Sequence, residues 1–207
     1  MTQYTLDTWR RRGVVLALVL APVLSWAQAR MAPDLFIQQL GDELMARVQS
    51  DPVLIKGDTE RIKALVDERV LPNMAFERMT ASTVGPAWRG ATPEQRDQLK
   101  DAFKTLLVRT YAGAVKHIAG KKLVVLPVRM ADGDTEVTVR SEIRSAGSEP
   151  VPLGYRLSAD GDHWVIYDIN VVGIWLVETY RTQFAQQIQK TGLDGLIAAL
   201  TRLNKGA

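Results

Sequence analysis

The sequence predicts an α+β fold in which helices cover one face of a curved antiparallel sheet of about four strands and enclose an apolar cavity. Apolar residues recur at helical spacing in the first half of the chain and again at its end. Between these parts, from Lys122 to Val172, apolar and polar residues alternate as in half-buried strands. Enzymes and inert binding proteins both use such folds, so the function has to be argued from a site.

The first 29 residues are expected to form a cleaved signal peptide outside this fold. Three arginines at residues 10–12 precede an apolar run over residues 14–24, and Ala-Gln-Ala at residues 27–29 suits signal peptidase. A membrane span is the alternative, but the run is shorter than the roughly 20 residues that cross a bilayer. We therefore predict an exported chain with a single domain over residues 30–207.

Charge and cysteine content exclude several classes of function. Removing residues 1–29 removes three arginines and one aspartate, which lowers the net charge from +3 to +1. This balance gives no support to a nucleic-acid partner or to polybasic membrane anchoring. The chain has no cysteine, so it cannot carry the lipid anchor of a bacterial lipoprotein, and its core must suffice without disulfides.

Three helices are predicted before residue 90. The first follows Pro33 and carries apolar residues at helical spacing. The second follows Asp58, whose side chain suits the N-cap position. A third, shorter helical segment holds Met74, Phe76 and Met79.

A long helix is predicted to follow Thr92 and to reach Ile118. Thr92 can cap it, Pro93 suits the first helical position, and Gln95 suits the third. At about 1.5 Å per residue, this helix is a rod of nearly 40 Å. Its apolar face begins at Leu99, and charged residues on its other face are typical of contact with solvent.

Four strands are predicted next, and they form a meander. They cover residues 122–126, 137–143, 151–157 and 163–172, and Asp-Gly-Asp at residues 160–162 is typical of a hairpin turn.

Gly173 is expected to end the sheet and to precede a helix with an apolar stripe from Ile174 to Ile188. Gly192 separates this helix from a last one over residues 193–203.

Catalytic signals are sparse. His117 and His163 lie near a helix end and a turn, where we expect them to face water. No cysteine nucleophile and no Gly-x-Ser-x-Gly run is present. Asp168 is an acidic residue within an apolar strand and is a candidate general base, but Arg181 lies within an apolar helical stripe and needs a partner. We therefore predict a structural pair of Asp168 and Arg181 that braces the last helices against the sheet.

Several spaced motifs occur in order along the chain. They are Trp-Arg-Gly-Ala-Thr-Pro-Glu-Gln-Arg at residues 88–96, Leu-Leu-Val-Arg-Thr-Tyr at 106–111, Trp-Val-Ile-Tyr-Asp at 164–168, Tyr-Arg-x-x-Phe at 180–184 and Gly-Leu-Asp-x-Leu-Ile at 192–197. Together they resemble the MlaC family of periplasmic phospholipid-binding proteins, also called the toluene-tolerance auxiliary family. Many members of that family carry Glu and Ser around this glycine, where the present chain has Val172 and Trp175 beside Gly173.

The resemblance implies a periplasmic phospholipid carrier that needs no cofactor, metal or enzymatic step. It implies two protein partners, an outer-membrane lipoprotein–porin complex and the periplasmic domain of an inner-membrane ABC transporter, and a role in maintaining outer-membrane lipid asymmetry. Three alternatives stay open at this point. They are a carrier of another amphiphile such as a hopanoid, a small α+β pocket enzyme that uses Asp168, and a structural adaptor for the transporter.

A carrier of this kind needs an apolar cavity, to which methionine adapts well and in which tyrosine can place a polar tip at the mouth. The predicted lipid-binding residues are Met74, Phe76, Met79, Phe103, Leu107, Tyr111, Val115, Val139, Tyr155, Tyr167, Ile169 and Val171.

Overall fold

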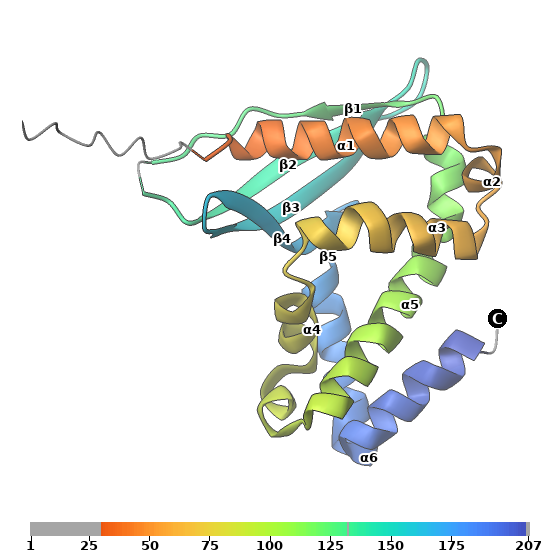
Figure 1. Ribbon diagram of the computed structural model, residues 1–207, viewed down its shortest axis with the longest axis vertical. Helices are drawn as coiled ribbons and strands as arrows, with labels where there is room; N and C mark the ends of the chain where they lie inside the picture. The colour runs from red at the N-terminus through yellow and green to blue at the C-terminus, as the bar shows by residue number, and fades with distance from the viewer. Residues whose placement is uncertain (1–29, 132, 206–207) are drawn as a thin grey trace, which may run out of the picture.

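A computed structural model describes residues 30–131 and 133–205, so the predicted signal peptide lies outside the described residues. The fold is α+β, as predicted, with one open antiparallel sheet in the order β1-β2-β3-β4-β5 (Figure 1). The fifth strand is short and was not expected, because the sequence predicted a helix from Ile174. The strands are β1 (Lys122–Val125), β2 (Glu136–Arg144), β3 (Val151–Asp160), β4 (His163–Val171) and β5 (Ile174–Trp175).

Helices surround one face of this sheet. Figure 1 shows α1 lying along the sheet, α4 and α6 extending below the sheet in this view, and α5 rising from them toward α2 and α3. No helix between residues 30 and 205 has the length and apolarity to span a membrane. The helices are α1 (Pro33–Ser50), α2 (Pro52–Ile55), α3 (Thr59–Leu65), the π-helical η1 (Val66–Val70), the 3-10 turns η2 (Leu71–Asn73) and η3 (Gly85–Gly90), α4 (Phe76–Val84), α5 (Pro93–Ile118) and α6 (Leu176–Lys205).

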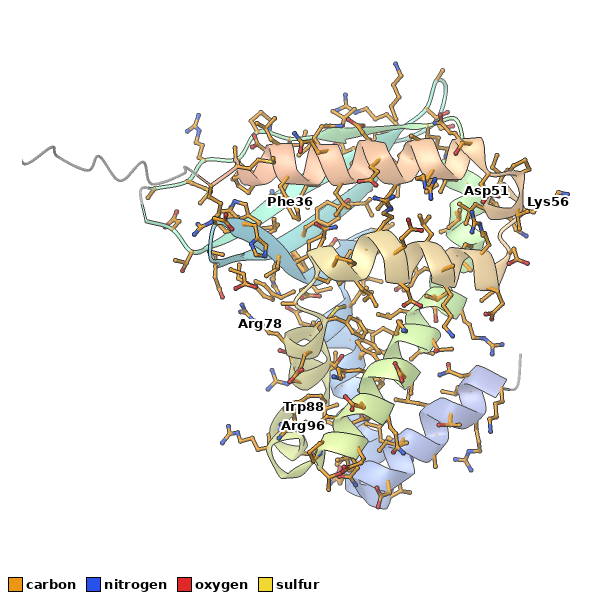
Figure 2. The ribbon with its side chains drawn as sticks, in the orientation of Figure 1. Phe36, Asp51, Lys56, Arg78, Trp88 and Arg96 are labelled. Carbon is orange, nitrogen blue, oxygen red and sulfur yellow. The ribbon has the colours of Figure 1, made fainter. Side chains whose placement is uncertain are left out.

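The predicted capping box at the start of α5 is confirmed. The Thr92 hydroxyl accepts a hydrogen bond from the Gln95 backbone N–H at 3.2 Å, and the Gln95 side chain accepts one from the Thr92 N–H at 3.0 Å. The Arg96 guanidinium lies 5.3 Å from the centre of the Trp88 ring and donates to the Trp88 carbonyl (Figure 2). The most specific motif of the sequence therefore fixes the direction in which the long helix leaves η3.

Gly192 interrupts the last helix, as predicted. Its φ of 70° and ψ of −174° are not helical, so the chain bends there although helical turns continue on both sides. The bend folds the end of α6 back toward α5 (Figure 1).

Three apolar cores fix the elements around the sheet. The first lies between α1 and the inner face of the sheet, where Ile37 meets Val139 and Leu157. The second joins α4, α5 and α6, and its centre is the fully buried Phe103, whose ring packs against Phe76, Tyr180 and Phe184 at centroid distances of 5.9, 5.1 and 5.5 Å. The third joins α1, α2 and α3 to the C-terminal half of α5 through Val48, Leu54, Ile62, Val108 and Ala112.

A β-bulge between β3 and β4 places the buried carboxylate. Leu157 pairs with Ile166 but Arg156 pairs with Asp168, so Tyr167 is an extra residue on β4. Asp168 therefore lies directly opposite Arg156 on the outer face of the sheet, and only 1% of its surface is exposed.

Both oxygens of Asp168 are engaged. Oδ1 accepts from the backbone N–H groups of Ile169 and Val177 at 2.9 and 3.0 Å, and Oδ2 accepts from Arg156 Nη1 at 3.0 Å. Because Val177 lies in the first turn of α6, the carboxylate caps that helix and opposes the positive end of its dipole. The Arg156 guanidinium also lies 4.0 Å from the centre of the Trp175 ring and reaches Glu178.

The prediction that Asp168 pairs with Arg181 is therefore wrong. Asp168 does brace α6 against the sheet, but its cation is Arg156 from the neighbouring strand, and Arg181 is exposed. The apolar stripe on α6 is narrower than the spacing suggested, and it leaves position 181 at its edge in contact with solvent.

Replacing Asp168 with Ala is expected to lower the free energy of unfolding by about 3–5 kcal/mol, because a buried ion pair loses one partner and an N–H group of α6 loses its acceptor. Urea unfolding followed by circular dichroism measures this loss. The control is Arg181→Ala, which should change stability by no more than about 0.5 kcal/mol. Equal losses in the two variants would contradict this account of how α6 is held.

Candidate functional site

An apolar cavity of about 350 Å³ lies between the inner face of the sheet and the helices. Its walls come from α3 and the turns after it, from α4, from α5 between Lys104 and Ile118, from strands β2 to β4 and from the first residue of α6. Most of its wall side chains are only partly buried, although they are apolar. The wall residues are Ile62, Val66, Val70, Leu71, Met74, Phe76, Met79, Lys104, Leu107, Val108, Tyr111, Ala114, Val115, Ile118, Ile143, Leu153, Ile169, Val171 and Leu176.

The cavity follows from helical and strand periodicity. On α5, Leu107, Tyr111 and Val115 are four residues apart and face the same side. On the sheet, Ile169 and Val171 are two residues apart and share the inner face. Side chains that line an apolar space lack dispersion contacts on that side. This architecture is therefore suited to an apolar ligand that supplies them.

Eight of the residues predicted from the sequence lie on the cavity wall. They come from three separate parts of the chain, which the fold brings together around one space. These residues are Met74, Phe76, Met79, Leu107, Tyr111, Val115, Ile169 and Val171.

The other four predicted residues are not on this wall, and the predicted lining is corrected accordingly. Phe103 is the centre of the aromatic core, and Val139 packs under α1. Tyr155 packs beside Val139, and its hydroxyl lies 3.3 Å from Ser141 Oγ. The guanidinium of Arg78 lies 3.7 Å from the centre of the ring of Tyr167, the bulge residue, whose hydroxyl lies 3.3 Å from Glu136 Oε2.

The sequence reasoning missed the part of the wall that lies before residue 74. Ile62, Val66 and Val70 have a spacing of four residues, which also fits an ordinary buried helix face. Periodicity shows which face is apolar but not whether another element or a cavity lies against it. Leu71 follows them in a 3-10 turn, which the helical pattern does not indicate.

The cavity is almost without polar groups. Burial, and to a smaller extent the nearby Tyr180, raises the pKa of the Tyr111 hydroxyl, which therefore stays neutral. Lys104 contributes its aliphatic stem, and its Nζ lies 2.9 Å from Asp67 Oδ1. The electrostatics suit a ligand whose buried part is uncharged.

Among the described residues, the aspartate and the histidines considered for catalysis are not on the wall of this cavity. Burial is the main cause that raises the pKa of Asp168, but its carboxylate lies on the outer face of the sheet and is fully hydrogen-bonded. Both histidines are exposed. Among the described residues, no three His, Cys, Asp or Glu side chains are grouped to hold a metal ion.

A strained turn lies beside the cavity wall residue Val171. Val172 and Gly173 connect β4 to β5 with φ angles of 51° and 85°. Two positive φ angles are typical of a type I′ turn, which favours Asn before Gly, whereas a β-branched residue is strained there. Val172 is 59% exposed, so burial of its side chain does not offset this strain.

Replacing Val172 with Asn is expected to raise the free energy of unfolding by about 1 kcal/mol, because Asn tolerates a positive φ. Thermal and urea unfolding measure this gain. The control is Ile174→Asn at the neighbouring exposed position, which has no such strain to relieve and should not stabilise the protein. A loss of stability in Val172→Asn would show that the valine side chain makes a compensating contact.

Comparison with known proteins places this cavity in context. The family profile described as "MlaC protein" matches residues 38–202. The intermembrane phospholipid transport system binding protein MlaC of Haemophilus influenzae is 24% identical over 177 residues, covering 84% of this chain and 83% of that protein. The toluene tolerance protein ttg2D of Pseudomonas putida is 24% identical over 185 residues, covering 89% and 85%.

A solved structure is more similar still. It is the phospholipid-binding protein from Ralstonia solanacearum in complex with a phospholipid, with 40% sequence identity and a TM-score of 0.79. The match covers 83% of this chain and 96% of that one.

Proposed function

The chain belongs to the MlaC family, and from this we propose that it binds and transports phospholipid, with the acyl chains held in the apolar cavity. The apolar wall between sheet and helices is the observation that carries this proposal. The similarity to the Ralstonia solanacearum protein, whose structure contains a phospholipid, supports it. The eight predicted wall residues are proposed to contact the acyl chains.

The magnitudes explain why a carrier must cover the tails. Each methylene removed from water contributes about 0.8 kcal/mol, so the roughly 30 methylenes of two acyl chains oppose free diffusion by on the order of 20 kcal/mol. Release into water is prevented by the same free energy. A partner or a membrane must therefore offer the tails another apolar site, and it must bind the open form of the carrier better than the closed form.

The size of the cavity implies that the walls move apart around cargo. Pockets for drug-sized ligands span about 300–1,000 Å³, and the cavity is near the lower end of this range. A phospholipid with two acyl chains is larger than most such ligands, so its binding is proposed to require the walls to move apart. The headgroup is proposed to lie at the mouth of the cavity.

We propose a periplasmic location, with residues 1–29 removed as a signal peptide and residues 30–207 acting as one domain. The proposed partners are an outer-membrane lipoprotein–porin complex and the periplasmic domain of an inner-membrane ABC transporter, between which the protein carries lipid to maintain outer-membrane asymmetry. We propose no enzymatic step, in keeping with the naming of the family and with the hydrogen bonds that occupy Asp168.

Organic extraction and lipid mass spectrometry of the protein, purified from bacterial periplasm without detergent, test the proposal. Close to one diacyl phospholipid per protein is the expected result. A polycyclic lipid in its place would indicate another amphiphile as cargo. A protein that is empty after purification and that takes up no phospholipid from vesicles would contradict the carrier function.

Replacing Val115 with Arg is expected to lower phospholipid occupancy at least about tenfold, because a cation in the tail site lacks a partner there. Mass spectrometry of the extracted lipid measures the occupancy. The fold should persist, since the charge points into a cavity, and a thermal unfolding curve checks this. Gly113→Arg is the matched control, because a side chain at this exposed position of the same helix meets open space.

A further inference from the structure

One part of the cavity wall differs from the rest in its structure. Residues 66–73, which comprise η1 and η2 and which we name the lid segment, contribute Val66, Val70 and Leu71 to the wall. Neither turn is α-helical, and no side chain of either is fully buried. π-helical turns are rare and are frequent at functional sites. With a cavity beneath it and few buried contacts, this segment is expected to open at low cost in free energy.

The lid segment is attached firmly at its two ends. On one side, Ile62 of α3 is buried in the third core, and Val66, the first residue of the segment, packs against the same core. On the other side, Met74 forms a β-bridge with Ile166, and the Ala75 N–H donates to the Ile166 carbonyl at 2.9 Å.

Between these ends, ion pairs connect the segment to its neighbours. Arg69 reaches Glu43 of α1 at 2.9 Å, and Glu68 lies 3.8 Å from Arg47 of α1. Asp67 accepts from Lys104 of α5 at 2.9 Å. Exposed pairs of this kind contribute only about 0–1 kcal/mol each.

Lys104 is distinctive among these partners because it is also part of the cavity wall. It is the charged residue among the described side chains of that wall, and its side chain is 17% exposed. The residues that follow it on the same helix face are apolar, from Leu107 through Tyr111 to Ile118. The wall of α5 therefore has a cation at one end and an apolar stripe beyond it.

The length of this stripe fits a lipid. From Lys104 to Ile118, the helix rises by about 21 Å at 1.5 Å per residue. The tails of one leaflet span roughly half of a hydrocarbon core of about 30 Å. A phosphate at Lys104 would therefore leave enough apolar wall to cover an acyl chain.

We infer that Lys104 recognises the phosphate of the entering lipid by leaving Asp67, so that cargo binding releases the lid segment. This inference rests on the proposed function. The exchange is balanced in charge, since one anion replaces another at the ammonium group. Asp67 is 43% exposed and can be hydrated once it is released, so no charge is left buried without a partner.

Lys104 can hold the phosphate without losing all of its protein contacts. An ammonium group has three donors, and Asp101 on the preceding turn of α5 lies 3.8 Å from Nζ. The ammonium therefore moves by a change of side-chain rotamer and needs no movement of the helix. The same step removes the tie between α5 and the middle of the lid segment.

The test compares two lipids that have the same tails and differ in the phosphate. The purified protein is incubated with vesicles of palmitoyl-oleoyl phosphatidylcholine that contain palmitoyl-oleoylglycerol, and the bound lipids are measured after extraction. The ratio of phospholipid to palmitoyl-oleoylglycerol bound to the protein is expected to exceed the same ratio in the vesicle by about tenfold, equivalent to 1.4 kcal/mol. Lys104→Met should reduce this preference to within about twofold while uptake of palmitoyl-oleoylglycerol persists.

Lys100→Met is the matched control. Lys100 lies one turn earlier on α5, pairs with Asp97 at 2.8 Å and with Glu77 at 3.8 Å, and is not part of the cavity wall. This variant should keep the preference of the unmodified protein. Lys104→Gln provides a second substitution if Lys104→Met does not fold, as judged by its thermal unfolding curve.

Asp67→Asn tests the lid directly. It frees Lys104 without removing it, so phospholipid uptake should become about threefold faster while the preference is kept. Uptake no faster than that of the unmodified protein would overturn the role of the ion pair in holding the lid segment.

The outcomes separate this inference from the proposed function. An undiminished preference for phospholipid in Lys104→Met, or no preference in the unmodified protein, overturns the role of Lys104 but leaves lipid carriage intact. Failure of the unmodified protein to take up either lipid overturns both.

Discussion

The buried carboxylate of Asp168 is the interaction on which the arrangement of sheet and helices depends. It joins the β4 backbone, the β3 side chain of Arg156 and the first turn of α6 in one cluster on the outer face of the sheet. α6 then supplies Tyr180 and Phe184 to the aromatic core around Phe103, which also holds α4 and α5. The helices on the far side of the cavity are therefore positioned by a carboxylate that does not touch the cavity.

The cavity persists because the sheet and α5, which form two of its walls, are fixed by contacts made elsewhere. α1 covers one half of the inner face of the sheet, and Val108 and Ala112 hold α5 against α2 and α3. The remaining half of the inner face cannot be reached by α5 without loss of those contacts. Apolar side chains consequently stay apart around an open space, where a freely collapsing core would close on itself.

Elements with local determinants could be predicted from the sequence, and elements set by long-range geometry could not. Thr92 and Gln95 determine the start of α5, and Gly192 determines the bend in α6, because caps and glycine conformations depend on neighbouring residues. The partner of Asp168 could not be identified, since a bulge of one residue decides which side chain lies opposite. Phe103 shares a helix face with Leu107, so spacing alone could not separate the core from the cavity wall.

The order of strands in the sheet affects how the protein reaches this state. Each strand pairs with the next one in the chain, so the strands can pair at the entropic cost of closing the loops between consecutive strands alone. The contacts of α5 with α6, by contrast, join segments separated by the whole meander. A contact between distant segments closes a longer loop of chain and costs more conformational entropy than a contact between neighbouring strands. This difference favours a late docking of these helices in folding. Until these helices dock, the part of the apolar inner face that lies opposite them is open to water, and a surface of this kind is where aggregation can compete with folding.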